Sequence, residues 1–448
     1  MKVLLMAYEC SPYRGSEWAV GWGRLLQASR AAEAHVITSE SNFAALKRAR
    51  EEGLLPEGVH IYTPPQDARR RKTEDRPGMF AYNYTAYHHW QKLALKLARE
   101  LHSREHFDLV HQVNVCTFRE PGYTWQLGIP YLWGPVGGSQ DFPASFLTML
   151  PAKEAFKEAA RSVSNWLSLR FKKRVRQAAR SAARIVAANS TNQRDYEHVF
   201  GRKIDLLLET GLHRVDEPDR SRWIERVEKL QRGEELPPLR LLWSGQFDTR
   251  KALPILLHAL AQLQGKVRFT LRVLGDGAMH DVWIQEARSL GLRVVLGHDR
   301  EADSVSHNTV EFLGKLPFQA AVAEMNSADL FCFTSLRDTS GNVVLEALAA
   351  GVPVVCFDHQ GAGDMVIDTS GVKLPVTSPK RAIADWAHTL RTLSEDPARL
   401  LALSEGTTEQ ARRFLWSANG DWINAAYRRL AGEREPGTQV EKKETVSA

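Results

Sequence analysis

The chain has little cysteine and no long hydrophobic run. These two shortages argue against a disulfide-stabilised protein and against a protein that spans a membrane. Four cysteines are scattered over 448 residues without the spacing of metal ligands. This excludes a disulfide scaffold, and isolated thiols in apolar surroundings are typical of a reducing compartment. The N-terminal apolar stretch is too short for a signal peptide, and no later segment approaches the length of a membrane span. We therefore expect a cytoplasmic protein.

Two further absences concern chemistry. The spacing Asp-x-Asp occurs nowhere in the sequence. The sequence therefore lacks the usual motif for a metal ion that bridges a diphosphate. The negative charge of a leaving diphosphate would instead be neutralised by Arg, Lys and backbone amides. We expect no metal and no other cofactor. The net charge of +6 is compatible with phosphate-bearing ligands, and without any nucleic-acid module signature we expect no nucleic-acid partner.

The length predicts two domains, since 448 residues exceed what one hydrophobic core holds. Apolar strand patterns alternate with helical patterns in both halves, which predicts an α/β, doubly wound fold. We place the first domain at 1–213, the second at 214–415, a last helix at 416–432 and a disordered tail at 433–448. The expected strands cover 2–7, 35–38, 59–62, 109–113, 131–133, 184–187, 239–243, 269–274, 294–296 or 310–313, 330–334 and 354–357.

The most informative segment runs from 337 to 355, where Asp338 and Glu346 stand eight positions apart. A buried strand precedes Asp338, and a helix is predicted to begin near Gly341 and to end at Gly351. This places a carboxylate beside free helix N-terminal amides at the carboxyl edge of a sheet, which suits a ligand with both hydroxyl and phosphate groups. The alternative is that both acids only cap and solvate a surface helix.

Three other strand ends carry candidate groups. Arg250 and Lys251 precede a predicted helix and would form an electropositive site of diphosphate size, unless they are a solvated surface pair. Gly15, in a loop after the first strand, would let a ligand approach the backbone closely. His111 ends or follows a strand and would face the same edge, although a lone histidine there is usually structural.

A basic segment from 153 to 184 is predicted to be helical, and its apolar residues could form one face. Such a helix can lie on an anionic membrane, at the inner face in a cytoplasmic protein. A solvated helix that covers its own domain is the alternative. A second basic group lies at Arg69–Lys72.

Taken together, these motifs resemble the group 1 (family 4) retaining nucleotide-sugar glycosyltransferases, which have the GT-B fold. The specific match is an acid, seven residues and a Glu, followed by the EA-x-A-x-G-x-PVV run that begins at Glu346. The resemblance implies two Rossmann-like domains that face a central cleft, with the final helix returning to the first domain. A weaker likeness, in the loops at 15–23 and 132–138, points to a bacterial exopolysaccharide or cell-surface polysaccharide subgroup.

The resemblance also implies roles for individual residues. Asp338 would hold sugar hydroxyls and stabilise charge at the anomeric carbon, Lys251 would neutralise the leaving diphosphate, and His111 would lie near the sugar. Glu346 would bind the ribose. The remaining donor-binding positions implied by the family pattern are Gly15, Gln246, Arg250, Ser340, Gly341, Asn342 and Val343.

Two positions depart from the family pattern. Asp338 stands where the family normally has Glu, and Gln246 stands where it has Arg. The second change removes one cation from the diphosphate site, although Arg250 could supply that charge.

The resemblance implies a metal-independent enzyme that transfers a sugar to a carbohydrate or lipid-linked acceptor. Two alternatives remain open: a non-catalytic GT-B partner protein, and a GT-B epimerase or phosphorylase.

Overall fold

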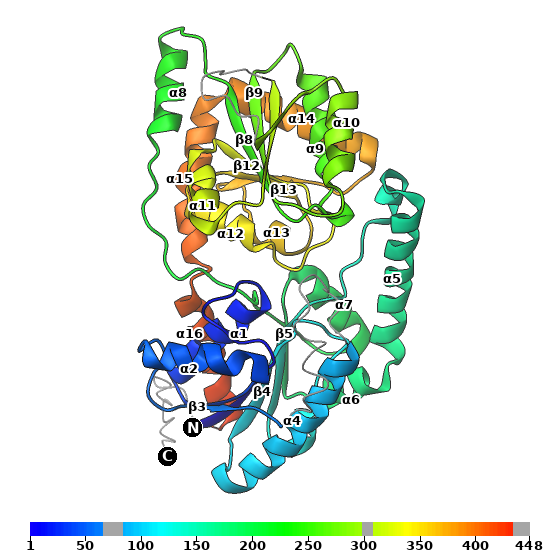
Figure 1. The fold of residues 1–448 in the computed structure, drawn as a ribbon, viewed down its shortest axis with the longest axis vertical. Helices are drawn as coiled ribbons and strands as arrows, with labels where there is room; N and C mark the ends of the chain where they lie inside the picture. Colours follow the sequence, from blue (N-terminus) through cyan, green and yellow to red (C-terminus); the bar gives the residue numbers. More distant parts are fainter. Residues whose placement is uncertain (66–83, 298–307, 433–448) are drawn as a thin grey trace, which may run out of the picture. The chain divides into compact units, whose positions relative to one another are not determined.

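A computed structural model describes residues 1–65, 84–297 and 308–432. The chain forms two compact units that interleave along the sequence (Figure 1). The first unit comprises Met1–Val136, Lys173–Val186 and Trp416–Ala448, and the second comprises Gly137–Lys172 and Ala187–Leu415. The predicted boundary at residues 213 and 214 stays a prediction.

The first sheet has the strand order β3-β2-β1-β4-β5-β6-β7 within the described residues. Strand β1 pairs in parallel with both β2 and β4, so the strand order reverses between β1 and β4. These strands are β1 (Lys2–Ala7), β2 (Glu33–Ile37), β3 (Val59–Tyr62), β4 (Leu109–Asn114), β5 (Tyr131–Val136), β6 (Arg184–Ala187) and β7 (Asp205–Leu206).

The second sheet repeats this plan with the order β10-β11-β9-β8-β12-β13-β14. Strand β8 pairs in parallel with β9 and β12, which puts the reversal between β8 and β12. Ligands of open α/β sheets bind at the carboxyl ends of strands at such a reversal. The strands are β8 (Leu239–Ser244), β9 (Phe269–Leu274), β10 (Arg293–Leu296), β11 (Thr309–Gly314), β12 (Leu330–Phe333), β13 (Val354–Phe357) and β14 (Gly371–Leu374).

Helices connect the parallel strands because a parallel crossover needs a long connection. Helix α1 packs on α16, and α9 packs on α14. In the second unit, helices cover both faces of the sheet (Figure 1). The α-helices are α1 (Glu17–Ser29), α2 (Phe43–Glu51), α4 (Tyr84–Glu105), α5 (Ala152–Phe171), α6 (Lys173–Ser181), α7 (Ser190–Phe200), α8 (Ser221–Gln231), α9 (Leu253–Leu263), α10 (His280–Ser289), α11 (Phe318–Ser327), α12 (Asn342–Ala349), α13 (Gln360–Met365), α14 (Pro379–Glu395), α15 (Pro397–Arg412) and α16 (Trp416–Leu430). Short 3-10 helices cover Glu40–Asn42 (η1), Thr124–Leu127 (η2), Ala144–Met149 (η3) and Thr249–Lys251 (η4).

Most of the predicted strands are present, and the doubly wound α/β prediction is confirmed. The choice between 294–296 and 310–313 was wrong, because both segments are strands and pair with each other. The sequence patterns missed β7 and β14, which are short. Strand β14 has only its end residues fully buried, so its hydrophobic pattern is weak. The basic segment at 153–184 forms two helices, α5 and α6, because Lys172 adopts an extended conformation between them.

No helix in the described part of the chain combines the length and the hydropathy needed to cross a membrane. The predicted disordered tail at 433–448 and the basic group at Arg69–Lys72 lie outside the described residues.

Candidate functional site

The carboxyl ends of β8 and β12 adjoin at the strand reversal of the second sheet. The chain leaves β8 through Gly245 and reaches the turn η4, and it leaves β12 toward Asp338. The backbone N–H of Leu336 donates to the carbonyl oxygen of Arg250 (2.9 Å), and Thr334 Oγ1 donates to that of Lys251 (2.7 Å). These bonds fix the two loops against each other, so residues 87 positions apart in the sequence meet.

A partly buried ion pair lies at this meeting point. The ammonium of Lys251 contacts Asp338 Oδ2 directly, and Arg250 Nη1 lies 3.5 Å from the same oxygen. Burial alone would raise the pKa of Asp338, but the charges of Lys251 and Arg250 outweigh it and hold that pKa below its ordinary value. Asp338 is therefore ionised at neutral pH, with 23% of its side chain exposed. The structure thus brings three of the candidate residues together, and their roles stay predictions.

The Asp338 loop is held by polar contacts from several elements of the second unit. Gln360 Oε1 accepts from the backbone N–H of Asp338 at 2.6 Å. Gln140 Nε2 donates to Thr339 Oγ1 (2.7 Å), and Asn189 Nδ2 donates to the Thr339 carbonyl (2.8 Å). A loop with so many partners is pre-organised, which reduces the entropy lost when a ligand binds.

Helix α12 begins directly after this loop. Its N-cap Gly341 has a φ of 74°, a left-handed conformation that glycine adopts without strain. A Cβ at Gly341 would also lie 2.7 Å from the ring of Phe333. The first amides of α12 lack intrahelical partners, and their proximity to the carboxylate of Asp338 stays a prediction. Asn342 is exposed and Val343 is partly exposed, whereas Ser340 is 2% exposed.

Glu346 lies one turn further along α12 and is exposed, and no ion pair is found for it among the described side chains. The backbone turns away after this helix at Gly351, whose φ is 76°. This is the left-handed ending that the sequence predicted. Gln246, at the end of β8, is exposed as well. Both side chains are accessible to a ligand, and their roles in donor binding stay predictions.

Glu209 is a candidate that the sequence reasoning missed. Its carboxyl group lies next to Ser340 and near Asp338, and 8% of the residue is exposed. Its Oε2 atom has no hydrogen-bond partner among the described residues. Burial raises the pKa of Glu209 to about 7, against the opposing interaction with Ser340, and the charge of Asp338 adds to the rise. A signal was present in the sequence, because Glu209 directly follows the apolar run at 206–208.

His111 belongs to the first unit and differs from its predicted setting. It lies within β4, opposite Leu5 in β1, and not at the end of a strand. It is 0% exposed, with Nδ1 2.6 Å from Tyr427 Oη and Nε2 2.5 Å from the carbonyl oxygen of Gly134. Burial and the nearby Arg24 charge lower the pKa of His111 to about 3. This arrangement favours a structural role for a neutral imidazole, and contact with a sugar stays a prediction.

Gly15 also belongs to the first unit, in the exposed loop that precedes α1. A Cβ added there would meet nothing within 4 Å, so the fold itself does not require glycine at this position. Any need for glycine would have to come from a bound ligand.

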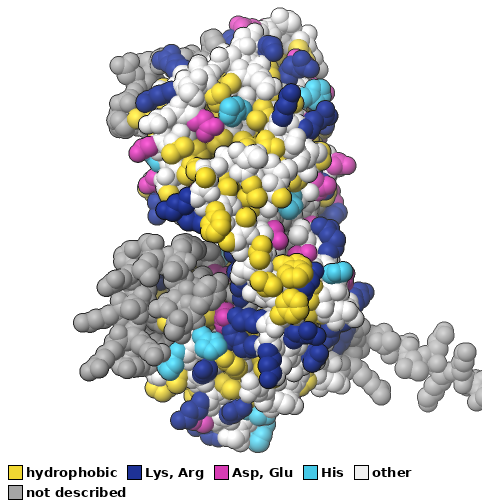
Figure 2. Space-filling model, turned by 90° about the vertical axis from the view of Figure 1, so that its right-hand side faces the viewer, with side chains coloured by type: hydrophobic (Ala, Val, Ile, Leu, Met, Phe, Trp, Pro, Cys, Tyr) yellow, Lys and Arg dark blue, Asp and Glu magenta, His cyan; other side chains and the backbone are white. Residues whose placement is uncertain are grey.

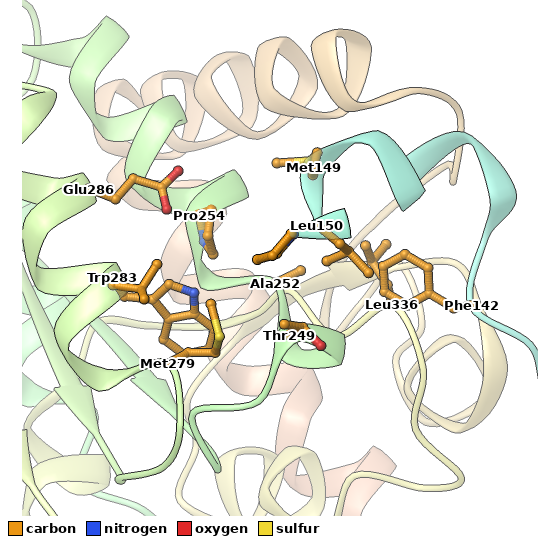
Figure 3. Close-up of a pocket in the computed structure, with 12 residues that line it drawn as sticks. Phe142, Met149, Leu150, Thr249, Ala252, Pro254, Met279, Trp283, Glu286 and Leu336 are labelled. Atoms are coloured by element: carbon orange, nitrogen blue, oxygen red, sulfur yellow. The ribbon is translucent and has the colours of Figure 1, made fainter. Parts of the chain in front are cut away.

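A pocket of about 200 Å³ lies beside η4 in the second unit (Figure 3). Figure 3 shows side chains from η4, α10 and the segment around η3 gathered around it. Its lining is mostly apolar, and this suits an apolar group better than a diphosphate. The predicted site residues do not line it. The lining residues are Phe142, Met149, Leu150, Pro151, Thr249, Ala252, Pro254, Met279, Val282, Trp283, Glu286 and Leu336.

Parts of this chain are similar in sequence to known proteins. Residues 238–396 match the family described as "Glycosyl transferases group 1". A D-inositol 3-phosphate glycosyltransferase from Saccharomonospora viridis is 32% identical over 193 residues, which is 42% of this chain and 42% of that protein. The one from Corynebacterium kroppenstedtii is 28% identical over 233 residues, covering 50% of this chain and 48% of the relative. The chain thus spans less than half the length of these relatives.

Solved structures resemble almost the whole chain. Sucrose-phosphate synthase from Thermosynechococcus elongatus covers 96% of this chain and 99% of its own, with a TM-score of 0.61 and 17% identity. HepE from Anabaena, in complex with UDP-glucose, covers 96% of this chain and 100% of its own, with a TM-score of 0.57 and 16% identity. These likenesses confirm the predicted GT-B type of α/β fold.

Proposed function

We propose that this chain, whose residues 238–396 match the group 1 glycosyl transferases, transfers a sugar from a nucleotide-sugar donor to a carbohydrate or lipid-linked acceptor, with retention of anomeric configuration. The observation that carries this proposal is the cluster of Lys251, Arg250 and Asp338 at the strand reversal of the second sheet. A solved structure with the same fold, HepE, holds UDP-glucose. Cell-surface or exopolysaccharide synthesis is the biological setting that we propose.

The cluster offers complementary groups for such a donor. Lys251, Arg250 and the first amides of α12 would neutralise the diphosphate as it leaves. Asp338, ionised beside them, would accept hydrogen bonds from sugar hydroxyls and stabilise positive charge at the anomeric carbon. The acceptor would attack the face from which the diphosphate departs, and the leaving phosphate oxygen would take the acceptor proton. Each group stabilises charge that is largest in the transition state.

The first test is donor binding. The purified protein would be screened by thermal shift against UDP-, GDP-, ADP- and dTDP-sugars, because a ligand that binds only the folded state raises Tm. We expect one nucleotide family to raise Tm in the wild type and to fail with Lys251→Ala. Asp338→Ala should lower turnover more than donor affinity.

The outcomes separate the competing functions. No shift with any donor would favour a non-catalytic partner protein. Donor isomerisation or phosphate-dependent cleavage without sugar transfer would favour an epimerase or phosphorylase. Activity that persists in EDTA is expected, because no step of the proposed mechanism uses a metal. A strict need for Mg²⁺ or Mn²⁺ in the chemical step would contradict it.

We also propose that α5 docks the protein on an anionic membrane. The buried residues of this helix are Glu158, Asn165 and Leu169, whereas several large apolar side chains are exposed on it. Figure 2 shows exposed hydrophobic side chains beside Lys and Arg on the face where α5 lies. The exposed apolar residues of α5 are Phe156 (75%), Val163 (59%), Trp166 (48%), Leu167 (46%) and Phe171 (63%).

Charge complementarity favours a bilayer as the occupant of this surface. Lys153, Lys157 and Arg170 lie on α5 among the apolar residues, so lipid phosphates and acyl chains would meet both kinds of group. The helix is also tied to the donor site, because Glu158 accepts two bonds from Arg337 (2.7 and 2.9 Å), the residue before Asp338. Docking would therefore bring the candidate site close to a lipid-linked acceptor.

Vesicle sedimentation tests this surface. Wild type should bind vesicles that contain phosphatidylglycerol and bind neutral phosphatidylcholine vesicles weakly. The double variant Trp166→Ser, Phe171→Ser should lose binding, whereas Phe318→Ser, an exposed phenylalanine on α11, should not. Equal binding by both variants would contradict docking through α5.

A further inference from the structure

A second cluster of chemically active side chains lies at the edge of the first sheet, within the first unit. Glu33 and His35 stand two positions apart on β2, so they share one face of the strand. His60 on β3 is the register partner of His35. Candidate ligand atoms of Glu33, His35 and His60 all lie within 4.8 Å of one another. We propose that this triad is a zinc site that clamps the edge strand β3 to β2.

The distances fit a single ion. Glu33 Oε1 lies 3.1 Å from His35 Nε2 and 3.3 Å from His60 Nε2. Tetrahedral Zn²⁺ with bonds of about 2.1 Å to N and O separates its ligand atoms by roughly 3.4 Å. The two imidazole rings come from neighbouring strands and are stacked, with centroids 4.5 Å apart. The ring of His60, whose side chain is 46% exposed, would therefore turn to point its Nε2 lone pair at the ion. Two histidines and a carboxylate leave the fourth position for water.

The surroundings orient His35 as a metal ligand. Its Nδ1 lies 3.2 Å from Tyr62 Oη. In the tautomer with hydrogen on Nδ1, that nitrogen donates to the Tyr62 oxygen and Nε2 keeps its lone pair. Metal-binding histidines almost always have such a partner on the other nitrogen.

One cation already lies near the triad. Lys2 Nζ is 3.8 Å from Glu33 Oε1, but it is closer to Glu105 Oε2, at 2.8 Å. Glu105 can therefore keep Lys2 while Glu33 turns to the metal. The ion would link two adjacent strands at the edge of a sheet and so stabilise their pairing.

The test uses the full chain, purified without a polyhistidine tag and stripped with chelator. After dialysis against ZnCl₂ and removal of free metal, elemental analysis should find one zinc per chain, and Tm should rise with added zinc. His60→Ala should remove both effects. That side chain is 46% exposed, so its loss should leave the fold intact, and circular dichroism would check this. Tyr62→Phe should weaken zinc binding by about 10- to 100-fold while retaining the site.

His213→Ala, at an exposed histidine of the second unit, is the matched control and should behave as wild type. Two results would overturn the proposal: no retained zinc in the wild type, or equal zinc in wild type and His60→Ala, which would place the ion elsewhere. A donor-induced thermal shift, measured on the same variants, should not change. This readout keeps failure of the zinc site distinct from failure of the proposed glycosyl transfer.

Discussion

The two sheets place polar residues at corresponding strands but give them opposite settings. Strand β4 lies next to β1 in the first sheet, and β12 lies next to β8 in the second. His111 lies within β4, is fully buried and is hydrogen-bonded to Tyr427 and Gly134. Asp338 stands beyond the end of β12, paired with Lys251 and still partly exposed. A side chain past the end of a strand can meet a ligand, whereas one within a central strand becomes part of the core.

The largest expected effect is at the accessible cluster. Lys251→Ala should lower kcat for sugar transfer by about 100-fold, because it removes a pre-organised charge from the leaving diphosphate. Initial rates at saturating donor would measure this. Lys203→Ala, an exposed lysine in the same unit, is the control and should retain full activity. If Lys251→Ala retained wild-type kcat, the site would be misassigned.

Glu209 makes the stability of the folded protein depend on pH. Its pKa is about 7 in the folded protein against an ordinary value of 4.5, so the folded state holds more protons between these values. This contribution to stability is full below about pH 4.5 and is lost as pH rises to about 7, by up to roughly 3 kcal/mol. Denaturant unfolding across this range should show that Glu209→Gln loses less stability than the wild type. Parallel pH profiles would contradict the assignment.

The stability contributed by the buried His111 should depend on pH in the opposite direction. The pKa of His111 is about 3 in the folded protein against 6.5 ordinarily, so its contribution is lost as pH falls below about 6.5. Tyr427→Phe leaves a buried ring nitrogen without its partner and should cost about 1–3 kcal/mol of unfolding free energy. Transfer activity at pH 7 should hardly change. A large fall in kcat with the fold intact would instead return His111 to the reaction.

The smallest effect is expected at Glu346. Glu346→Gln removes an exposed acid that we assign to the donor ribose, and it should raise the donor Kd by about 10-fold with little change in kcat. Isothermal titration with the donor identified by thermal shift would measure this. Glu395→Gln on α14, an exposed glutamate elsewhere, should bind the donor normally. A fall in kcat without a change in Kd would assign Glu346 to the chemical step.

Local sequence signals were sufficient for much of the fold. Buried strands such as β12 are short apolar runs, and the glycines at 341 and 351 mark the ends of α12 through their left-handed conformations. The pairing of Asp338 with Lys251 was also predictable in outline, because both follow strands of one parallel sheet. The triad of Glu33, His35 and His60 was not, since it depends on the register of two strands.

The sequence by itself determined the alternation of strands and helices, the two doubly wound sheets and the acids and cations that follow their strands, because periodicity and turn residues act locally. Only the tertiary structure decided which polar groups are buried and which are accessible to solvent. It buried His111, left five large apolar residues of α5 exposed (Phe156, Val163, Trp166, Leu167 and Phe171) and placed Glu209 beside Ser340. Burial and proximity depend on packing between distant segments, and no local pattern records them.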